Sequence, residues 1–478
     1  MLESEESSSA PVVPLSTGSV RGIADDGVAR FLGIPYAEPP VGDRRFAAPV
    51  PAAPWDEVRD ARSFGPTAPQ SPYRGALGEL LHAVILDGEE VLTVNVWAPA
   101  TRVGNAPVVL WLHGGSLEHG TAAQPAYDGT PFARDGVVFV SANYRLGAEG
   151  FSVLDGAPLN LGLRDVALAL EWVHREIAAF GGDPARITIM GESAGGALVA
   201  ALLARPASRA FVAGAIIQSG PLEASDPTQA RRASDAIAKR LGIAATREAF
   251  AAVSPSDLVR ARAEIAAGSS PLKGAPGFVL AVDPESLPRS PHLALADTDV
   301  PILIGTNTDE YRLWLGPDDL AALGRMKTWL ARRVMRIRES AARAVRDAMP
   351  HASAGEVLGQ LVTDRVLRAP ATRLARARTA PTYLYEFAWP SPVRDLRAAH
   401  AIEIAFAFGR LDDEDALRLI GDDAPESLAR DMHAAWVSFI ATGDPGWPAF
   451  DEARLTRIWD VTSETVPQRR AAVVDALE

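Results

Sequence analysis

Residues Gly191-Glu192-Ser193-Ala194-Gly195 place a serine between two glycines in a G-x-S-x-G pattern. The apolar run 186–190 before this pattern predicts a strand, and the small residues 195–203 after it predict a helix. A strand that turns sharply into a helix exposes the serine hydroxyl beside a helix N-terminus, which favours developing negative charge. The context therefore predicts that Ser193 is a nucleophile. A plain Gly/Ser turn into a helix is the less favoured interpretation.

A second glycine motif could supply the matching oxyanion hole. The predicted strand 108–112 runs directly into His113-Gly114-Gly115-Ser116, where glycines allow backbone N–H groups to approach a substrate oxygen closely. In isolation this motif would be an ordinary Gly-Gly turn. Together with the serine motif it predicts that the N–H groups of Gly115, Ser116 and Ala194 bind the oxyanion.

A serine nucleophile needs a histidine base and an acid that orients it. When the serine sits in a strand-to-helix turn, the acid and then the histidine follow it along the chain. The predicted strand 301–304 ends in Gly305-Thr-Asn-Thr-Asp309-Glu310, which brings two carboxylates to the carboxyl end of a strand. The sequence predicts the acid here and leaves Asp309 and Glu310 as alternatives.

Four histidines follow Ser193, and their surroundings differ. An acid near position 310 excludes the first of them, because that histidine precedes the acid. His351 follows a proline at a predicted helix end, and His433 lies among helix formers, so both are interpreted as structural. His400 is the leading candidate for the base, with an ordinary core or surface histidine as the alternative. The four are His292, His351, His400 and His433.

Short apolar runs that alternate with amphipathic helices predict an α/β fold with a mostly parallel sheet covered on both faces. The clearest helix spans 161–179, with Gly181 as its left-handed end. A late strand is predicted where Tyr383, Tyr385, Phe387 and Trp389 alternate. The buried strands are expected at 108–112, 137–141, 187–190, 215–217 and 302–304.

The chain is expected to form one folded unit. Residues 1–12 are acidic and Ser-rich, which predicts a flexible tail, and residues 13–478 are expected to form a single domain. Two stretches rich in Ala and Arg, 226–287 and 326–380, are interpreted as helical insertions that leave the sheet and form a cap.

Composition excludes several classes of function. The 478 residues include no cysteine, which removes disulfides and thiolate chemistry, and nothing implies a metal or an organic cofactor. The net charge of −13 repels nucleic acid and anionic lipid surfaces. The first residues lack a secretory signal pattern and no run of about 20 apolar residues occurs. A cytoplasmic protein without nucleic-acid or membrane partners is expected, with a monomer favoured.

Beyond these motifs, the chain resembles the type-B carboxylesterase and cholinesterase-like family of α/β-hydrolases over nearly its whole length. Residues 31–40 (FLGIPYAEPP) are similar to the family's N-terminal signature, and residues 89–96 (EEVLTVNV) to its E-D-C-L-x-L-N-V segment. Residues 191–196, 305–310 and 400–406 are similar to its serine, acid and histidine motifs. The resemblance implies the α/β-hydrolase fold with helical insertions and a triad of Ser193, Glu310 and His400. It also implies that Ser219 supports the acid and the histidine.

The chain departs from the family pattern at several positions. Val91 stands where the family has a cysteine, as in a bacterial-type member without the disulfide, and Arg397 replaces the glycine of the histidine motif. Leu117, Glu118 and His119 follow the oxyanion motif where relatives carry aromatic residues that face the pocket. They are expected at the pocket rim, where the negative charge of Glu118 would favour cationic substrates; a solvated loop is the alternative.

The resulting hypothesis is a serine carboxylesterase that works through an acyl-enzyme on a small-molecule ester. A carbamate or amide hydrolase of a xenobiotic would use the same triad and is the nearest alternative. A non-catalytic binding module of the same family is a remote one, because such relatives have lost the triad.

Overall fold

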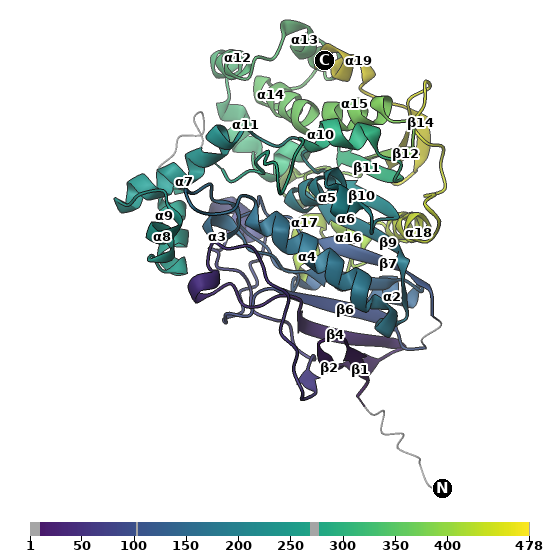
Figure 1. Ribbon diagram of the computed structural model, residues 1–478. Helices are drawn as coiled ribbons and strands as arrows, with labels where there is room; N and C mark the ends of the chain where they lie inside the picture. Colours follow the sequence, from purple (N-terminus) through teal and green to yellow (C-terminus); the bar gives the residue numbers. More distant parts are fainter. Residues whose placement is uncertain (1–9, 102–103, 268–276, 478) are drawn as a thin grey trace.

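The computed structural model describes residues 10–101, 104–267 and 277–477, and its centre is one large twisted sheet (Figure 1). Within these residues the sheet has 11 strands. Its middle, from β8 to β13, is parallel, while β14 and the strands β6, β4 and β3 pair antiparallel at the two ends. In spatial order the strands are β14 (Glu464–Pro467), β13 (Leu455–Trp459), β12 (Thr382–Phe387), β11 (Ile302–Asn307), β10 (Gly214–Gln218), β9 (Gly182–Glu192), β7 (Ala106–Leu112), β8 (Val138–Ala142), β6 (Thr93–Pro99), β4 (Val28–Pro35) and β3 (Ile23–Asp25).

The sheet separates two hydrophobic cores because successive side chains of a strand point to opposite faces. In β7, Val108 and Leu110 join the core that also contains α4 and α5, whereas Val109 and Trp111 join the core that contains α16 and α18. The central strands are therefore apolar on both faces, which is the pattern of a buried parallel sheet. This confirms the predicted α/β class.

Helices cover both faces, and α4 crosses the front of the sheet in Figure 1. The helices of the described residues are α1 (Gly75–Leu80), α2 (Thr130–Arg134), α3 (Gly147–Phe151), α4 (Leu161–Glu176), α5 (Ala194–Ala204), α6 (Pro206–Arg209), α7 (Pro227–Leu241), α8 (Arg247–Ala251), α9 (Pro255–Ala267), α10 (Pro291–Ala294), α11 (Pro317–Ala322), α12 (Arg325–Val334), α13 (Glu339–Ala348), α14 (Ala354–Thr363), α15 (Ala369–Ala377), α16 (Glu403–Ala407), α17 (Glu414–Ile420), α18 (Glu426–Thr442) and α19 (Ala471–Leu477). A π-helical turn, η6 (Asp364–Arg368), joins α14 to α15.

The predicted central strands and the long helix are present, with shifted ends. The helix predicted over 161–179 is α4 followed by the 3₁₀ turn η3 (Ile177–Phe180), and Gly181 ends it at φ 88°. The late strand stops at Phe387, so Trp389 lies beyond it. A small sheet, β1 (Val12–Leu15), β2 (Gly18–Arg21) and β5 (Arg59–Asp60), was not predicted, because strands this short carry little periodicity.

The two predicted insertions contain mostly helices in the residues that the structure describes, although residues 277–287 form none. The first contains α7, α8 and α9, and its residues 268–276 lie outside the described part of the chain. The second contains α12 to α15, and in Figure 1 α12 and α13 lie at the margin of the molecule farthest from β1 and β2. The tail expected over 1–12 falls mostly on residues 1–9, which the structure does not describe, and Val12 already belongs to β1.

Candidate active site

Ser193 lies in a strained turn between β9 and α5. Its φ and ψ are 54° and −120°, a conformation that L-residues rarely adopt, so the surroundings must hold it in place. Its N–H donates to the carbonyl of Gln218 on the neighbouring strand at 2.8 Å. A Cβ on Gly195 would lie 1.9 Å from the carbonyl oxygen of Leu112, so only glycine fits there. The G-x-S-x-G spacing is thus a packing requirement of this turn.

The loop after β7 carries backbone donors that have no acceptor. Gly115 and Ser116 adopt φ values of 112° and 57°, and their N–H groups donate to none of the described residues. Ala194 is the first residue of α5, where a helix N–H has no intrahelical acceptor. The three N–H groups predicted from the sequence are therefore available to a substrate oxygen at the cavity that Gly115, Ser116 and Ser193 line.

His113 and Gln70 hold this loop in shape. The ring of His113 stacks on Tyr144 at 4.5 Å, and its Nδ1 lies 2.8 Å from the carbonyl of Gly114. Burial lowers the pKa of His113 to about 4, so the ring is neutral. The side-chain amide of Gln70 bonds both the N–H and the carbonyl of Gly120, at 2.8 and 2.9 Å. The loop is thus fixed before any substrate arrives.

Glu310 and His400 meet at the carboxyl end of β11. Nδ1 of His400 lies 2.6 Å from Oε2 of Glu310, and both side chains are buried. The other carboxylate oxygen, Oε1, accepts from the hydroxyl of Ser219 and from the N–H of Asn307, each at 2.7 Å. These bonds fix the carboxylate, which in turn fixes the imidazole. Ser219, for which the resemblance implied a supporting role, thus contacts Glu310 directly.

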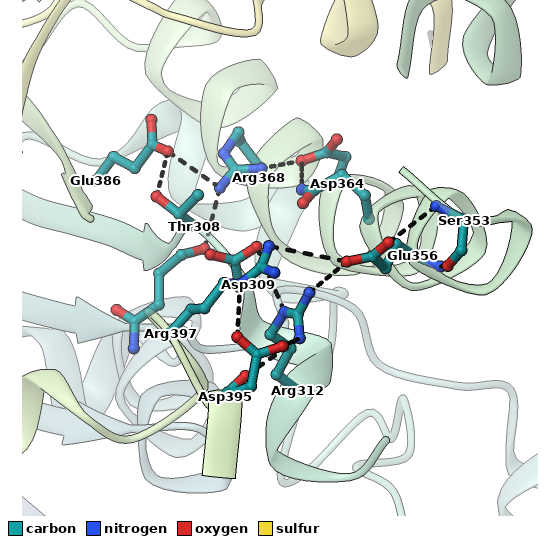
Figure 2. A network of polar contacts seen from close by, with 12 residues as sticks. Thr308, Asp309, Arg312, Ser353, Glu356, Asp364, Arg368, Glu386, Asp395 and Arg397 are labelled. Atoms are coloured by element: carbon teal, nitrogen blue, oxygen red, sulfur yellow. Dashed lines mark hydrogen bonds and ion pairs between the residues drawn. The ribbon is translucent and has the colours of Figure 1, made fainter. Parts of the chain in front are cut away.

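The side chain of Asp309, the alternative acid, makes no hydrogen bond or ion pair with His400 in the described part of the chain. It lies on the side of the loop where Figure 2 shows an array of arginines and carboxylates, and burial raises its pKa. Arg312 is 4.0 Å from its carboxylate. Arg397, at φ 53°, occupies the left-handed conformation that suits the family's glycine. The array consists of Thr308, Asp309, Arg312, Glu356, Asp364, Arg368, Glu386, Asp395 and Arg397.

Arg368 joins this array to the acid loop. It is fully buried, ion-paired with Asp364, and burial lowers its pKa to about 10. Its Nη2 donates to the carbonyl of Asn307 at 3.0 Å. The side chain of Asn307 also donates to the carbonyl of Ala399 at 2.6 Å, directly before His400. Asn307 therefore connects the strand that carries the acid to the loop that carries the histidine.

Two carboxylates lie against the imidazole, and a third acidic side chain, Glu403, interacts with it electrostatically. Oε1 of Glu192 lies 3.0 Å from Nε2 of His400, although the two atoms are not aligned for a hydrogen bond. Burial opposes charge on the imidazole, but Glu192 and Glu310 outweigh it and raise the pKa of His400 well above its usual value. Burial together with repulsion from Glu192 and Glu310 raises the pKa of Glu403 to about 8, so Glu403 holds a proton at pH 7.

Sequence reasoning missed the roles of Glu192, Glu403 and Asn307. Glu192 is the variable residue of the serine motif, and Glu403 lies three positions after His400, at the start of α16. The closeness of Glu403 to His400 in the sequence was the available signal. The other histidines lie elsewhere: His433, for example, is buried in α18 with Nδ1 2.8 Å from the carbonyl of Ala407.

The site opens into a cavity of about 590 Å³. Ser193, His400 and the oxyanion loop line one side of it. Trp314, whose ring lies 4.8 Å from that of His400, and aliphatic residues of α1, α16 and α17 form most of the remaining wall. Its aliphatic residues are Leu77, Leu80, Leu81, Val84, Leu313, Ile402, Ile404, Leu419 and Ile420.

The three rim residues separate in the structure. Glu118 and His119 line the cavity, and the ring of His119 lies 4.4 Å from that of Tyr73, tilted by 37°. Leu117 is only 5% exposed and packs in the core, because the left-handed turn at φ 61° directs it inward. The expectation of Leu117 at the rim is therefore wrong.

The charge of Glu118 is neutralised by a residue that the sequence did not indicate. Its two oxygens accept from Nη2 and Nε of Arg262 on α9, at 2.7 and 2.8 Å. The side chains of Arg262 and Glu118 are 14% and 15% exposed. The solvated-loop alternative and the unpaired charge that would favour cationic substrates both fail, since Glu118 faces the cavity as half of an ion pair.

Comparisons with known proteins identify the family of the chain. The profile of the carboxylesterase family matches residues 9–468. The chain is 36% identical to the para-nitrobenzyl esterase of Bacillus subtilis (strain 168) over 96% of each chain, and 35% identical to the phenmedipham hydrolase of Pseudarthrobacter oxydans over 92% of this chain and 93% of that one.

Solved structures agree as well. The structure of a Geobacillus stearothermophilus carboxylesterase at pH 6.2 superposes with a TM-score of 0.87 at 34% identity, covering 98% of this chain and all of that one. A para-nitrobenzyl esterase structure gives 0.85 at 34% identity, covering 98% and 99%. The chain has the α/β-hydrolase fold and belongs to the carboxylesterase family, whose members hydrolyse carboxylic esters.

Proposed function

We propose that the protein cleaves its ester by a two-step mechanism centred on Ser193. His400 takes the proton from the Ser193 hydroxyl as that oxygen attacks the ester carbonyl, and it then gives the proton to the departing alkoxide. Water hydrolyses the acyl-enzyme by the same proton path. The observation that carries the proposal is the pairing of Nδ1 of His400 with Glu310 at 2.6 Å, while Nε2 has no hydrogen-bond partner among the described residues, in a side chain that lines the same cavity as Ser193.

The tetrahedral intermediate carries its negative charge on the former carbonyl oxygen. In the proposed mechanism the N–H groups of Gly115, Ser116 and Ala194 bind this oxygen. Support comes from their lack of acceptors among the described residues and from the rigid loop that holds them. Donors held rigidly in advance are worth about 10²–10³-fold in kcat each, because no reorganisation is needed when charge develops.

The cavity favours esters with an apolar group of moderate size. Leu, Ile and Trp side chains form much of its wall, and the charges of Glu118 and Arg262 neutralise each other. Two further carboxylates line the cavity: Glu192 lies beside His400, and Asp415 lies beside His82. Relatives named for para-nitrobenzyl esters and for phenmedipham are consistent with neutral aryl substrates. We therefore propose neutral alkyl or aryl esters as the substrate class.

The test is turnover of p-nitrophenyl esters of graded chain length, measured beside aryl carbamates and anilides. Esters should be cleaved fastest, and Ser193→Ala should lower kcat by about 10⁴-fold or more with the folded structure retained. An organophosphonate should label Ser193 alone, as read by mass spectrometry of the digested protein. Ser193→Ala activity within tenfold of the parent would overturn the proposal.

A further inference from the structure

Helix α12 carries its apolar side chains toward solvent. Met326 is 83% exposed, Trp329 51%, Leu330 47% and Val334 72%. The side of α12 that packs against the protein instead carries Thr328, which donates to the carbonyl of Ala354, and Arg332, which pairs with Glu339. This is the reverse of an ordinary surface helix, whose apolar stripe faces the core.

The exposed apolar residues form one continuous face. Positions 326, 329, 330 and 334 fall on the same side of a helix with 3.6 residues per turn, opposite Thr328 and Arg332. In Figure 1 this helix lies at the margin of the molecule, beyond α11 and α14. We call Met326, Trp329, Leu330 and Val334 the α12 apolar face.

Positive charge surrounds the α12 apolar face. Residues 325–338 contain six basic residues and no acidic one, in a chain whose net charge is −13. The guanidinium of Arg333 lies 5.1 Å from the ring of Trp329. Only Arg332 among the six makes an ion pair with a described residue; the five exposed cations that make none are Arg325, Lys327, Arg333, Arg336 and Arg338.

An apolar centre with a cationic border matches an anionic lipid surface. Trp, Leu and Met enter the boundary between headgroups and acyl chains, while Lys and Arg bind the phosphates. A second copy of the protein fits less well, because a twofold contact would place the same five cations against each other. The whole-chain charge opposes approach only at long range, since salt at physiological strength screens charges beyond about 8 Å.

We propose that α12 docks the protein on membranes that contain anionic phospholipid, with the α12 apolar face inserted at the interface. The contact is peripheral, because no helix in the described part of the chain is long and apolar enough to cross a bilayer. The segment 310–334 begins at Glu310, passes the cavity wall at Trp314 and ends on α12. Docking would hold the esterase where apolar esters concentrate, but the docking itself does not depend on the catalytic assignment.

The experiment is co-sedimentation of the protein with vesicles of phosphatidylcholine alone or with about one-third phosphatidylglycerol. The parent protein should bind the anionic vesicles at least tenfold more tightly and should lose this preference at high salt. Trp329→Ser/Leu330→Ser should weaken binding about tenfold or more. Lys327→Gln/Arg333→Gln should weaken it about 25-fold, at about fivefold for each cation removed.

Matched variants elsewhere separate docking from general surface effects. Val461→Ser removes another apolar side chain that is 69% exposed, and Arg44→Gln/Arg430→Gln removes two exposed cations far from α12 in sequence. Both controls should bind vesicles like the parent, and all variants should keep p-nitrophenyl ester turnover, which shows that they are folded. Three results would each overturn the proposal: no binding to anionic vesicles, equal loss in α12 variants and controls, or light scattering that shows a dimer which the α12 variants abolish.

Discussion

The carboxyl edge of the sheet and the helical insertions differ in how their residues are held. At the edge, Ser116, Ser193 and Ser219 all adopt positive φ values, between 48° and 57°, and each is held by strands or glycines that leave no space for another arrangement. In the second insertion, α13 and α14 pack around a small apolar cluster that includes Ala341, Val345 and Val357, and α12 leaves its apolar side in solvent. The residues at the sheet edge are held in fixed positions, whereas the insertions present side chains to the cavity and to solvent.

This difference separates reactivity from selectivity. The edge supplies backbone donors and buried carboxylates, whose positions follow from motifs that are local in the chain. The first insertion supplies Arg262 on α9, which forms an ion pair with Glu118. This pair neutralises the charge of Glu118 at the cavity wall, where a substrate would bind. Substitutions at the edge should therefore affect all substrates alike, whereas substitutions in the insertions should change the ratio between substrates.

The largest predicted effect after loss of Ser193 is at the acid. Glu310→Gln keeps the shape of the side chain but removes the charge that orients and stabilises the imidazolium, so kcat should fall about 10³–10⁴-fold for every ester tested. Asp309→Asn is the matched control, because the Asp309 side chain makes no hydrogen bond or ion pair with His400 in the described structure, and it should cost less than about tenfold. Equal losses in the two variants would contradict the assignment of the acid to Glu310.

The second prediction concerns pH. His400 must be neutral to accept a proton, and its pKa is raised, so kcat/KM should rise with pH through a midpoint above the usual histidine value of about 6.5. Glu192→Gln removes a carboxylate that favours the charged imidazole, which should move this midpoint downward by about one unit.

Glu403→Gln is the control for that shift. Below its pKa of about 8, Glu403 already carries a proton, so the substitution removes no charge there and should move the midpoint less than Glu192→Gln does. The measurement is the pH profile of kcat/KM with a neutral ester. A parent midpoint at or below 6.5, or a profile that Glu192→Gln leaves in place, would show that Glu192 does not act on His400.

The contrast between the sheet edge and the helical insertions also explains which features could be predicted from the sequence. The strand before Ser193, the glycines beside it and the order of serine, acid and histidine are local or ordered along one chain, so the meeting of Glu310 with His400 could be expected. Local signals could not show that Arg262 reaches Glu118 across 144 positions, or that Leu117 turns inward. Those outcomes depend on tertiary packing of helices whose Ala- and Arg-rich sequences fit many neighbours.

The α12 apolar face shows the same limit in another way. The net charge of −13 indicated a chain that repels anionic surfaces. This value is summed over all residues, so it does not show where positive charge gathers locally. The six cations of residues 325–338 are visible in the sequence, but only the structure shows that Thr328 and Arg332 face inward and the apolar residues outward. Net charge is therefore a poor guide to what one helix contacts.

The smallest predicted effect tests selectivity at the ion pair of Glu118 and Arg262. Glu118→Gln should leave the cation of Arg262 unpaired at the cavity wall and raise kcat/KM for an anionic ester, relative to its neutral isostere, by about five- to tenfold at low salt. Arg262→Gln should leave Glu118 unpaired and move the ratio the other way by a similar factor.

The double variant should return close to the parent ratio, because both charges are gone. High salt should shrink both single effects, since part of the pair is exposed. If the double variant instead keeps the full shift of one single variant, the two charges are not coupled, and the selectivity of the cavity must come from its apolar wall.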